Sequence, residues 1–150
     1  QVDPPQRAAY ASRFAEFERG WRQHTARWRA MAAPLKGRTV IAQHSSFAYW
    51  WRWLGMAQTA DLEPKPGLPP TPGHLNTVLR QARQSPPMAV VATRYQDARS
   101  ARWLAEQLGR PALALSLPST VEDPQDPQSL ARLFDELLRQ LLPLASAAPP

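Results

Sequence analysis

The sequence contains no cysteine, which excludes disulfide bonds, thiolate zinc sites and thiol nucleophiles. No apolar stretch approaches the roughly 20 residues that a membrane-spanning helix needs. The glycine-rich nucleotide motifs, the G-x-S-x-G nucleophile turn and the H-E-x-x-H zinc motif are missing as well. With no strong catalytic motif in the chain, we expect that the protein is not an enzyme.

Lysine is also scarce, and Lys36 and Lys65 are its two occurrences. Arginine therefore supplies most of the positive charge behind the net charge of +6. A basic, arginine-rich chain is one signature of nucleic-acid binding. Here the arginines are spread along every expected helix, and no run of basic residues is longer than one. This spacing is typical of a solvated surface, so we expect no nucleic-acid partner.

The 150 residues are 43% apolar and include six tryptophans, enough for one domain with a hydrophobic core. Before Pro34, apolar and aromatic residues recur at intervals of three and four, which predicts one long helix of about 28 residues and roughly 42 Å. The stripe comprises Tyr10, Phe14, Phe17, Trp21, His24, Trp28 and Met31. We expect His24 to be a packing residue within it.

Short apolar segments and amphipathic segments alternate after this helix. Strands are expected at 39–42, 58–64, 88–93 and 112–117, and helices at 45–53, 71–84, 97–109 and 129–142. Alternation of this kind favours an α/β fold with a four-stranded parallel sheet and helices on both faces. The predicted organisation is a linking helix over 1–34, an α/β lobe over 35–143 and a flexible tail over 144–150.

Several side chains have expected structural roles. Ser45 or Ser46 is predicted to cap the helix after the first strand, and Thr71 and Asp97 to cap later helices. Trp50 and Trp53 are three residues apart and should share a helix face. Trp51 should then be partly exposed, or buried against a missing neighbour.

His44 stands where the first strand ends. In open parallel sheets, ligands bind outside the carboxyl ends of the strands, and a neutral imidazole there is a natural zinc ligand. Zinc takes about four ligands, however, and the chain has only three histidines. The residues alone leave three alternatives for His44: a metal ligand, a hydrogen-bonded structural residue, or a base beside Ser45.

Three stretches resemble a known family: "LKGRTVIAQHSSFAYWWRWLGM", "LEPKPGLPPTPGHLNTVLRQ" and "MAVVATRYQDARSARWLAEQLGRPALAL". Together they are similar to the C-terminal lobe of the zinc/manganese (cluster A-I) solute-binding proteins of ABC transporters. The resemblance implies a periplasmic protein of two lobes joined by a long helix, which holds a metal between the lobes and delivers it to a membrane permease. The chain would then be a processed product or an excised piece that lacks the N-terminal lobe.

The resemblance also implies roles for single residues. The ligand after the first strand falls on His44, and a histidine there goes with zinc more often than with manganese. The usual aspartate after the last strand falls at or near Pro118, which cannot bind metal. Glu122 and Asp123 are then weak candidates for a second ligand.

Ser45, Tyr95 and Glu63 are expected to line the same cleft. For Glu63, we expect that it caps a nearby helix or pairs with an arginine, rather than binding metal or the permease. Because the usual aspartate is missing, an alternative function stays open: the same fold with a degenerate metal site, acting as a protein-interaction module. The exposed aromatic residues of the cleft could then also mediate a dimer.

Overall fold

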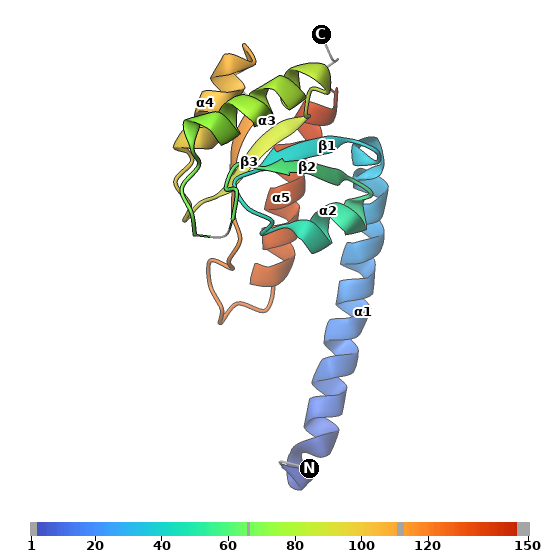
Figure 1. Cartoon of the computed structure of the whole chain (residues 1–150). Coiled ribbons are helices and arrows are strands. Elements are labelled where there is room, and N and C mark those ends of the chain that lie inside the picture. Colours follow the sequence, from blue (N-terminus) through green and yellow to red (C-terminus); the bar gives the residue numbers. More distant parts are fainter. Residues whose placement is uncertain (1–2, 66, 111–112, 147–150) are drawn as a thin grey trace.

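A computed structural model describes residues 3–65, 67–110 and 113–146 of the chain. It confirms the expected fold class, because all four strands are parallel and lie in one sheet of order β2-β1-β3-β4 (Figure 1). The strands are β1 (Thr39–Ala42), β2 (Ala57–Asp61), β3 (Ala89–Thr93) and β4 (Ala114–Leu117).

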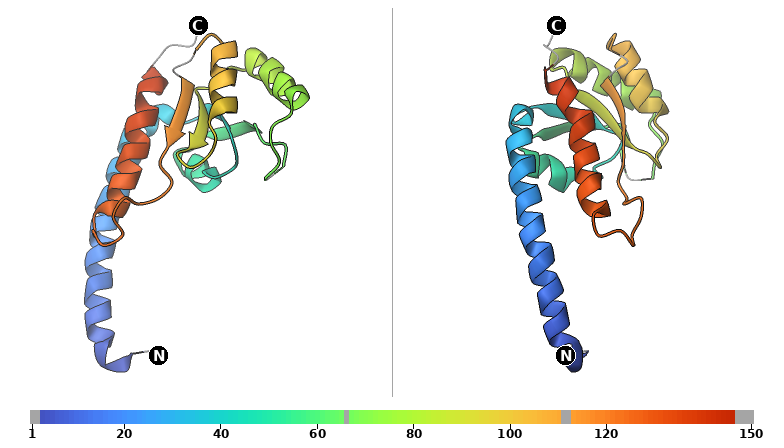
Figure 2. Two further views of the ribbon diagram at one scale, coloured as in Figure 1. Left: turned by 90° about the vertical axis from the view of Figure 1, so that its left-hand side faces the viewer. Right: turned by 180° about the vertical axis from the view of Figure 1, so that it is seen from behind.

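Helices cover both faces of this sheet (Figure 2). They are α1 (Arg7–Met31), α2 (Ala48–Leu54), α3 (Pro72–Gln84), α4 (Arg99–Gln107) and α5 (Ser129–Ser146), with short 3-10 turns at Pro4–Gln6 and Ala33–Leu35. One core cluster joins the sheet to α1, α2 and α5, and the other joins it to α3 and α4.

The two central strands, β1 and β3, divide their side chains between these clusters. Val40 and Val91 face α1, α2 and α5, whereas Ile41 and Val90 face α3 and α4. Successive side chains of a strand point to opposite faces, so a strand covered on both sides must be apolar throughout. This requirement explains the continuous apolar run of β3, all of whose residues are buried.

Only the C-terminal half of α1 packs on the lobe, and its N-terminal half extends away from it (Figures 1 and 2). Trp28 is 1% exposed, whereas Tyr10, Phe14 and Phe17 are 52%, 64% and 51% exposed. The predicted stripe is therefore a core face at one end and an uncovered aromatic face at the other.

The last helix is longer than predicted. It continues through Pro143 to Ser146, so residues 144–146 are helical, and the remainder of the expected tail lies outside the described residues. Leu141 and Ala145 are buried on either side of the proline, and Arg38 donates a hydrogen bond to the Ala145 carbonyl at 3.1 Å. Tertiary packing thus extends the helix past a residue that removes one helical hydrogen bond.

Two expectations for α2 were wrong. Trp51 is 2% exposed and donates from Nε1 to Gln58 Oε1 at 3.0 Å, so the lobe itself buries it. Neither serine caps the helix, because Phe47 occupies the N-cap position without a side-chain hydrogen bond. The pairing of Trp50 with Trp53 is confirmed, since their rings stack at 5.1 Å and 8°.

Of the two other predicted caps, the one at Thr71 is confirmed and the one at Asp97 is not. Thr71 Oγ1 accepts from the backbone N–H of His74 at 3.3 Å at the start of α3. The N-cap position of α4 is Ala98, which has no side-chain cap. Asp97 lies one residue earlier, where it accepts from the backbone N–H of Arg99 at 3.0 Å and pairs with the Arg99 guanidinium. The hydrogen bonds from the Arg99 side chain and backbone, together with the positive charges of Arg99 and Arg102, hold the pKa of Asp97 below its ordinary value.

Candidate functional site

The carboxyl ends of the parallel strands bring the predicted site residues to one edge of the sheet. His44 follows β1 by two residues, Tyr95 follows β3 by two, and Pro118 directly follows β4. His44 is half-buried, Tyr95 is 72% exposed and Pro118 is buried. The fold therefore places His44 where a ligand of an open α/β sheet is expected.

Hydrogen bonds fix the backbone on both sides of His44. The N–H of Gln43 donates to the Val91 carbonyl at 2.6 Å, which continues the β1–β3 ladder by one residue. The His44 carbonyl accepts from the N–H of Ser46 at 2.8 Å in a tight turn. These backbone hydrogen bonds anchor the chain on both sides of His44.

Ser45 is held by a carboxylate that no sequence motif indicated. Its hydroxyl donates to Asp61 at 3.1 and 3.3 Å, and Gln58 Nε2 donates to the same carboxylate at 2.6 Å. Asp61 ends β2, beside β1 in the sheet. The sequence predicts a strand over 58–64, which places Asp61 in its middle, and it predicts a helix-capping role for Ser45. Neither expectation points to this pair.

Glu63 holds the proline-rich loop in place. Its Oε1 accepts from Gln43 Nε2 and its Oε2 accepts from the Gly67 N–H, both at 3.3 Å. Neither a helix cap nor an arginine pair forms at Glu63 among the described residues, because the carboxylate is occupied by the strand end and its own loop. Glu63 and Gln43 line one hollow of about 680 Å³ between this loop and α4.

The two weak ligand candidates lie in the loop between β4 and α5. Asp123 Oδ1 accepts from the Gln125 N–H at 2.8 Å, which makes it a turn residue. Glu122 is exposed and borders a hollow of about 400 Å³ that Arg94, Arg132 and Arg139 also line. Asp135 and Glu136 line the same hollow, so its arginines are accompanied by carboxylates.

The carboxylates of α5 in this hollow are strongly paired. Hydrogen bonds from Arg139 and Gln140, with the nearby Arg94 charge, lower the pKa of Glu136 to about 2. Burial alone would raise the pKa of Asp135, but hydrogen bonds from Trp28 and Arg27 outweigh it and lower that pKa. These groups stabilise the packing of α5 and are not free ligands.

Within residues 3–65, 67–110 and 113–146, no group of three or more histidine, aspartate or glutamate side chains is arranged to hold a metal ion. His44, Glu122 and Asp123 therefore do not form such a group of three there. Among the same described residues, no helix is both long and apolar enough to cross a membrane.

Comparison with protein families gives a match over nearly the whole chain. Residues 1–142 match the model of ZnuA, the periplasmic component A of zinc-uptake complexes. The chain belongs to this family. Family membership makes it a relative of metal-binding solute-binding proteins of ABC importers, which are transport proteins. No curated protein sequence matches the chain significantly.

Solved structures share the fold at low sequence identity. A ZnuA crystal structure is 22% identical in sequence to this chain and has a TM-score of 0.73. The structure of FpvC from Pseudomonas aeruginosa in complex with Ni²⁺ is 19% identical and has a TM-score of 0.74. A Cd-bound periplasmic metal-binding protein from Candidatus Liberibacter asiaticus is 16% identical and has a TM-score of 0.70. These matches cover 97%, 99% and 96% of this chain but only 52%, 56% and 55% of those structures. The chain thus spans about half their length.

Proposed function

We propose that the chain is the C-terminal lobe of a zinc-binding solute-binding protein that serves an ABC importer in the periplasm. Its family supports a role in metal uptake. Structures with the same fold are described in complex with Mn²⁺, Ni²⁺ or Cd, so the family alone does not select zinc. Zinc is favoured because the proposed ligand is an imidazole, which suits zinc better than manganese.

The position of His44 carries the proposal. It is half-buried at the carboxyl end of β1, and its neighbours are held by the sheet and by Asp61. Preorganised placement of a ligand lowers the entropic cost of metal binding. Ser45, Tyr95 and Glu63 would line the cleft around it, and Glu122 and Asp123 are the secondary ligand candidates.

A single histidine supplies one of about four zinc ligands, so water would complete the coordination on this chain. We therefore expect weak zinc binding here and tight binding only when a second lobe adds its own ligands. Closure of two lobes around the ion would present a joint surface to the membrane permease. The segment over residues 1–34, which contains α1, would connect the two lobes.

A zinc titration against a chromogenic chelator tests the proposal. The chain should compete weakly for zinc, and His44→Ala should abolish that competition. His74→Gln is the matched control, because His74 Nε2 lies 2.9 Å from the Asp61 carbonyl and glutamine can keep this contact. Binding that survives His44→Ala would place the metal elsewhere and reject His44 as the ligand.

The second candidate function is a degenerate metal site in a protein-interaction module. Pro118 at the end of β4 and the uncovered aromatic residues of α1 favour it. If neither the chain nor its control competes for zinc, this alternative becomes the better explanation. Sedimentation of the chain at several concentrations would then show whether its aromatic face forms a dimer.

A further inference from the structure

Each neighbour of His44 in the chain is hydrogen-bonded to a carboxylate. The residue before it, Gln43, donates from Nε2 to Glu63 Oε1 at 3.3 Å. The residue after it, Ser45, donates from its hydroxyl to Asp61 at 3.1 Å. Asp61 is the last residue of β2, and Glu63 follows it by two residues. The fold therefore brings one acidic side chain to each side of the strand end that carries His44.

Backbone hydrogen bonds hold this acidic segment against the end of β1. The N–H of Leu62 donates to the Ala42 carbonyl at 2.8 Å, and the N–H of Glu63 donates to the Gln43 carbonyl at 3.1 Å. Both Asp61 and Glu63 are half-buried. Their positions are thus fixed by the sheet, because the β2–β1 hydrogen bonding continues past the last residue of β2.

Neither carboxylate forms an ion pair among the described residues. The donors to Asp61 are a hydroxyl and an amide, and those to Glu63 are an amide and a backbone N–H, so all are neutral. The arginines that follow β3 are paired with other carboxylates, Arg94 with Glu136 and Arg99 with Asp97. Half-buried charges are normally paired. A cation bound at this strand end would supply the missing countercharge, although the chain as a whole carries a net charge of +6.

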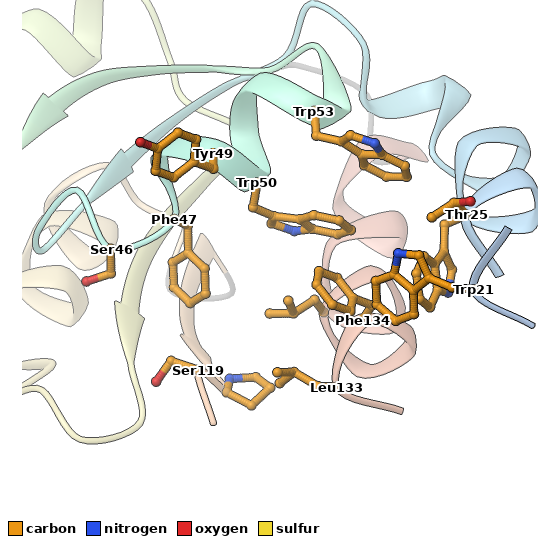
Figure 3. A pocket seen from close by; sticks show the side chains of 13 residues that line it. Trp21, Thr25, Ser46, Phe47, Tyr49, Trp50, Trp53, Ser119, Leu133 and Phe134 are labelled. Carbon is orange, nitrogen blue, oxygen red and sulfur yellow. The ribbon is translucent and has the colours of Figure 1, made fainter. Parts of the chain in front are cut away.

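The chain after Ser45 enters an apolar environment. Ser46 and Phe47 line an aromatic pocket of about 480 Å³ between α1, α2 and α5 (Figure 3). Among the described residues that line it, none is aspartate, glutamate, lysine, arginine or histidine. Walls of low dielectric constant beside charges of one sign concentrate the electric field. The pocket therefore adds no cation that would offset the negative charges beside His44.

We propose that Asp61 and Glu63 make the strand end at His44 a local anionic site in a basic chain, and that their charges draw a divalent cation to the His44 imidazole. They act through charge and by holding Ser45 and Gln43, so they are positioning residues and not ligands. This role agrees with the finding that no three such side chains of the described residues are arranged to hold a metal ion. The inference rests on the proposed metal role of His44.

The absence of cysteine allows the potential at this position to be measured without any metal. His44→Cys introduces a single thiol, whose rates of reaction with two methanethiosulfonates are compared. One reagent carries a trimethylammonium group and the other a sulfonate, and each forms a disulfide with the thiolate and releases methanesulfinate. Both rates depend equally on the fraction of thiolate, so the ratio of the cationic to the anionic rate reports the local potential.

Removal of either carboxylate charge should lower this ratio. In the His44→Cys chain, Asp61→Asn and Glu63→Gln should each reduce it by about threefold or more at low salt. Both amides keep an oxygen that accepts the existing hydrogen bonds. Glu106→Gln is the matched control and should leave the ratio unchanged, because Glu106 is an exposed carboxylate in the last turn of α4, at the other end of the sheet.

Zinc titration of the chain with His44 present gives the second readout. Asp61→Asn and Glu63→Gln should each weaken His44-dependent zinc binding by about fivefold or more at low salt. The loss should shrink in about 1 M salt, where charges are screened within about 3 Å. Asp61→Glu restores the charge and should recover the affinity, whereas Glu106→Gln should have no effect. Urea unfolding of each variant shows that the fold is kept.

The outcomes separate this inference from the proposed function. A rate ratio that Asp61→Asn and Glu63→Gln change no more than Glu106→Gln does would overturn the inference. Zinc affinity that falls equally at low and high salt would show a purely structural role and would also overturn it. If the rate ratio falls as expected but zinc binding does not depend on His44, the anionic strand end is confirmed and the proposed function of His44 is rejected.

Discussion

Asp135 provides the strongest test of how α1 and α5 are held together. Its carboxylate accepts from Trp28 Nε1 at 2.6 Å and from Arg27 at 2.7 and 2.9 Å. Trp28 is 1% exposed, so removal of the carboxylate leaves the indole N–H buried without an acceptor. Asp135→Ala should therefore destabilise the lobe through this single donor more than through the lost charge.

The expected cost follows from burial. An unsatisfied buried donor costs about 1–3 kcal/mol. The Arg27–Asp135 ion pair is 47% and 37% exposed at its two side chains, so its own contribution is below about 1 kcal/mol. The free energy of unfolding should fall by about 2–3 kcal/mol, which for a domain of this size lowers Tm by about 5–10 °C.

Urea unfolding followed by circular dichroism measures this cost. Arg27→Ala removes only the exposed ion pair and should cost less than about 1 kcal/mol. In a Trp28→Phe background, which has no indole donor, Asp135→Ala should lower the free energy of unfolding by no more than Arg27→Ala does in the unmodified chain. Equal destabilisation by Arg27→Ala and Asp135→Ala in the unmodified chain would refute the reasoning.

The same carboxylate has a defined pH dependence. Because the pKa of Asp135 is lowered in the folded protein, its contribution to stability is present above the ordinary carboxyl pKa of about 4. It is lost as pH falls through the folded pKa. The difference in free energy of unfolding between the chain and Asp135→Ala should thus reach its full size near pH 7 and become smaller at acidic pH.

Three further predictions concern other contacts. Pro143→Ala should raise the free energy of unfolding by about 1 kcal/mol or more in urea melts, because Pro143 is exposed and alanine restores a helical hydrogen bond. Trp51→Phe should lower it by about 1–2 kcal/mol in the same assay, because the hydrogen bond to Gln58 is lost. Glu136 has its pKa lowered to about 2 by its hydrogen bonds, from Arg139 first. The Glu136 carboxylate therefore contributes fully to the stability of the fold above the ordinary pKa near 4, and this contribution is lost as pH falls toward 2. The free energies of unfolding of the chain and of Glu136→Gln, measured as a function of pH, should converge near pH 2.

Features that depend on local pattern were predictable from the chain itself. The apolar run of β3, the Thr71 cap and the stripe of α1 follow from residue spacing, because burial on a strand or helix repeats with the period of that element. The parallel sheet followed from the alternation of strands and helices. The placement of His44 near a strand end followed from its position two residues after an apolar segment.

Features that depend on distant neighbours were not predictable in this way. Trp51 is buried because Gln58 and the sheet edge receive it, and Ser45 bonds to Asp61 across two strands. The last turn of α5 survives Pro143 because Ala145 and Arg38 hold it. Sequence by itself determined the elements and their order, and it left a metal ligand as one of three possible roles for His44. Tertiary structure alone decided which polar groups pair and where an aromatic pocket opens, because those outcomes depend on contacts between segments far apart in the chain.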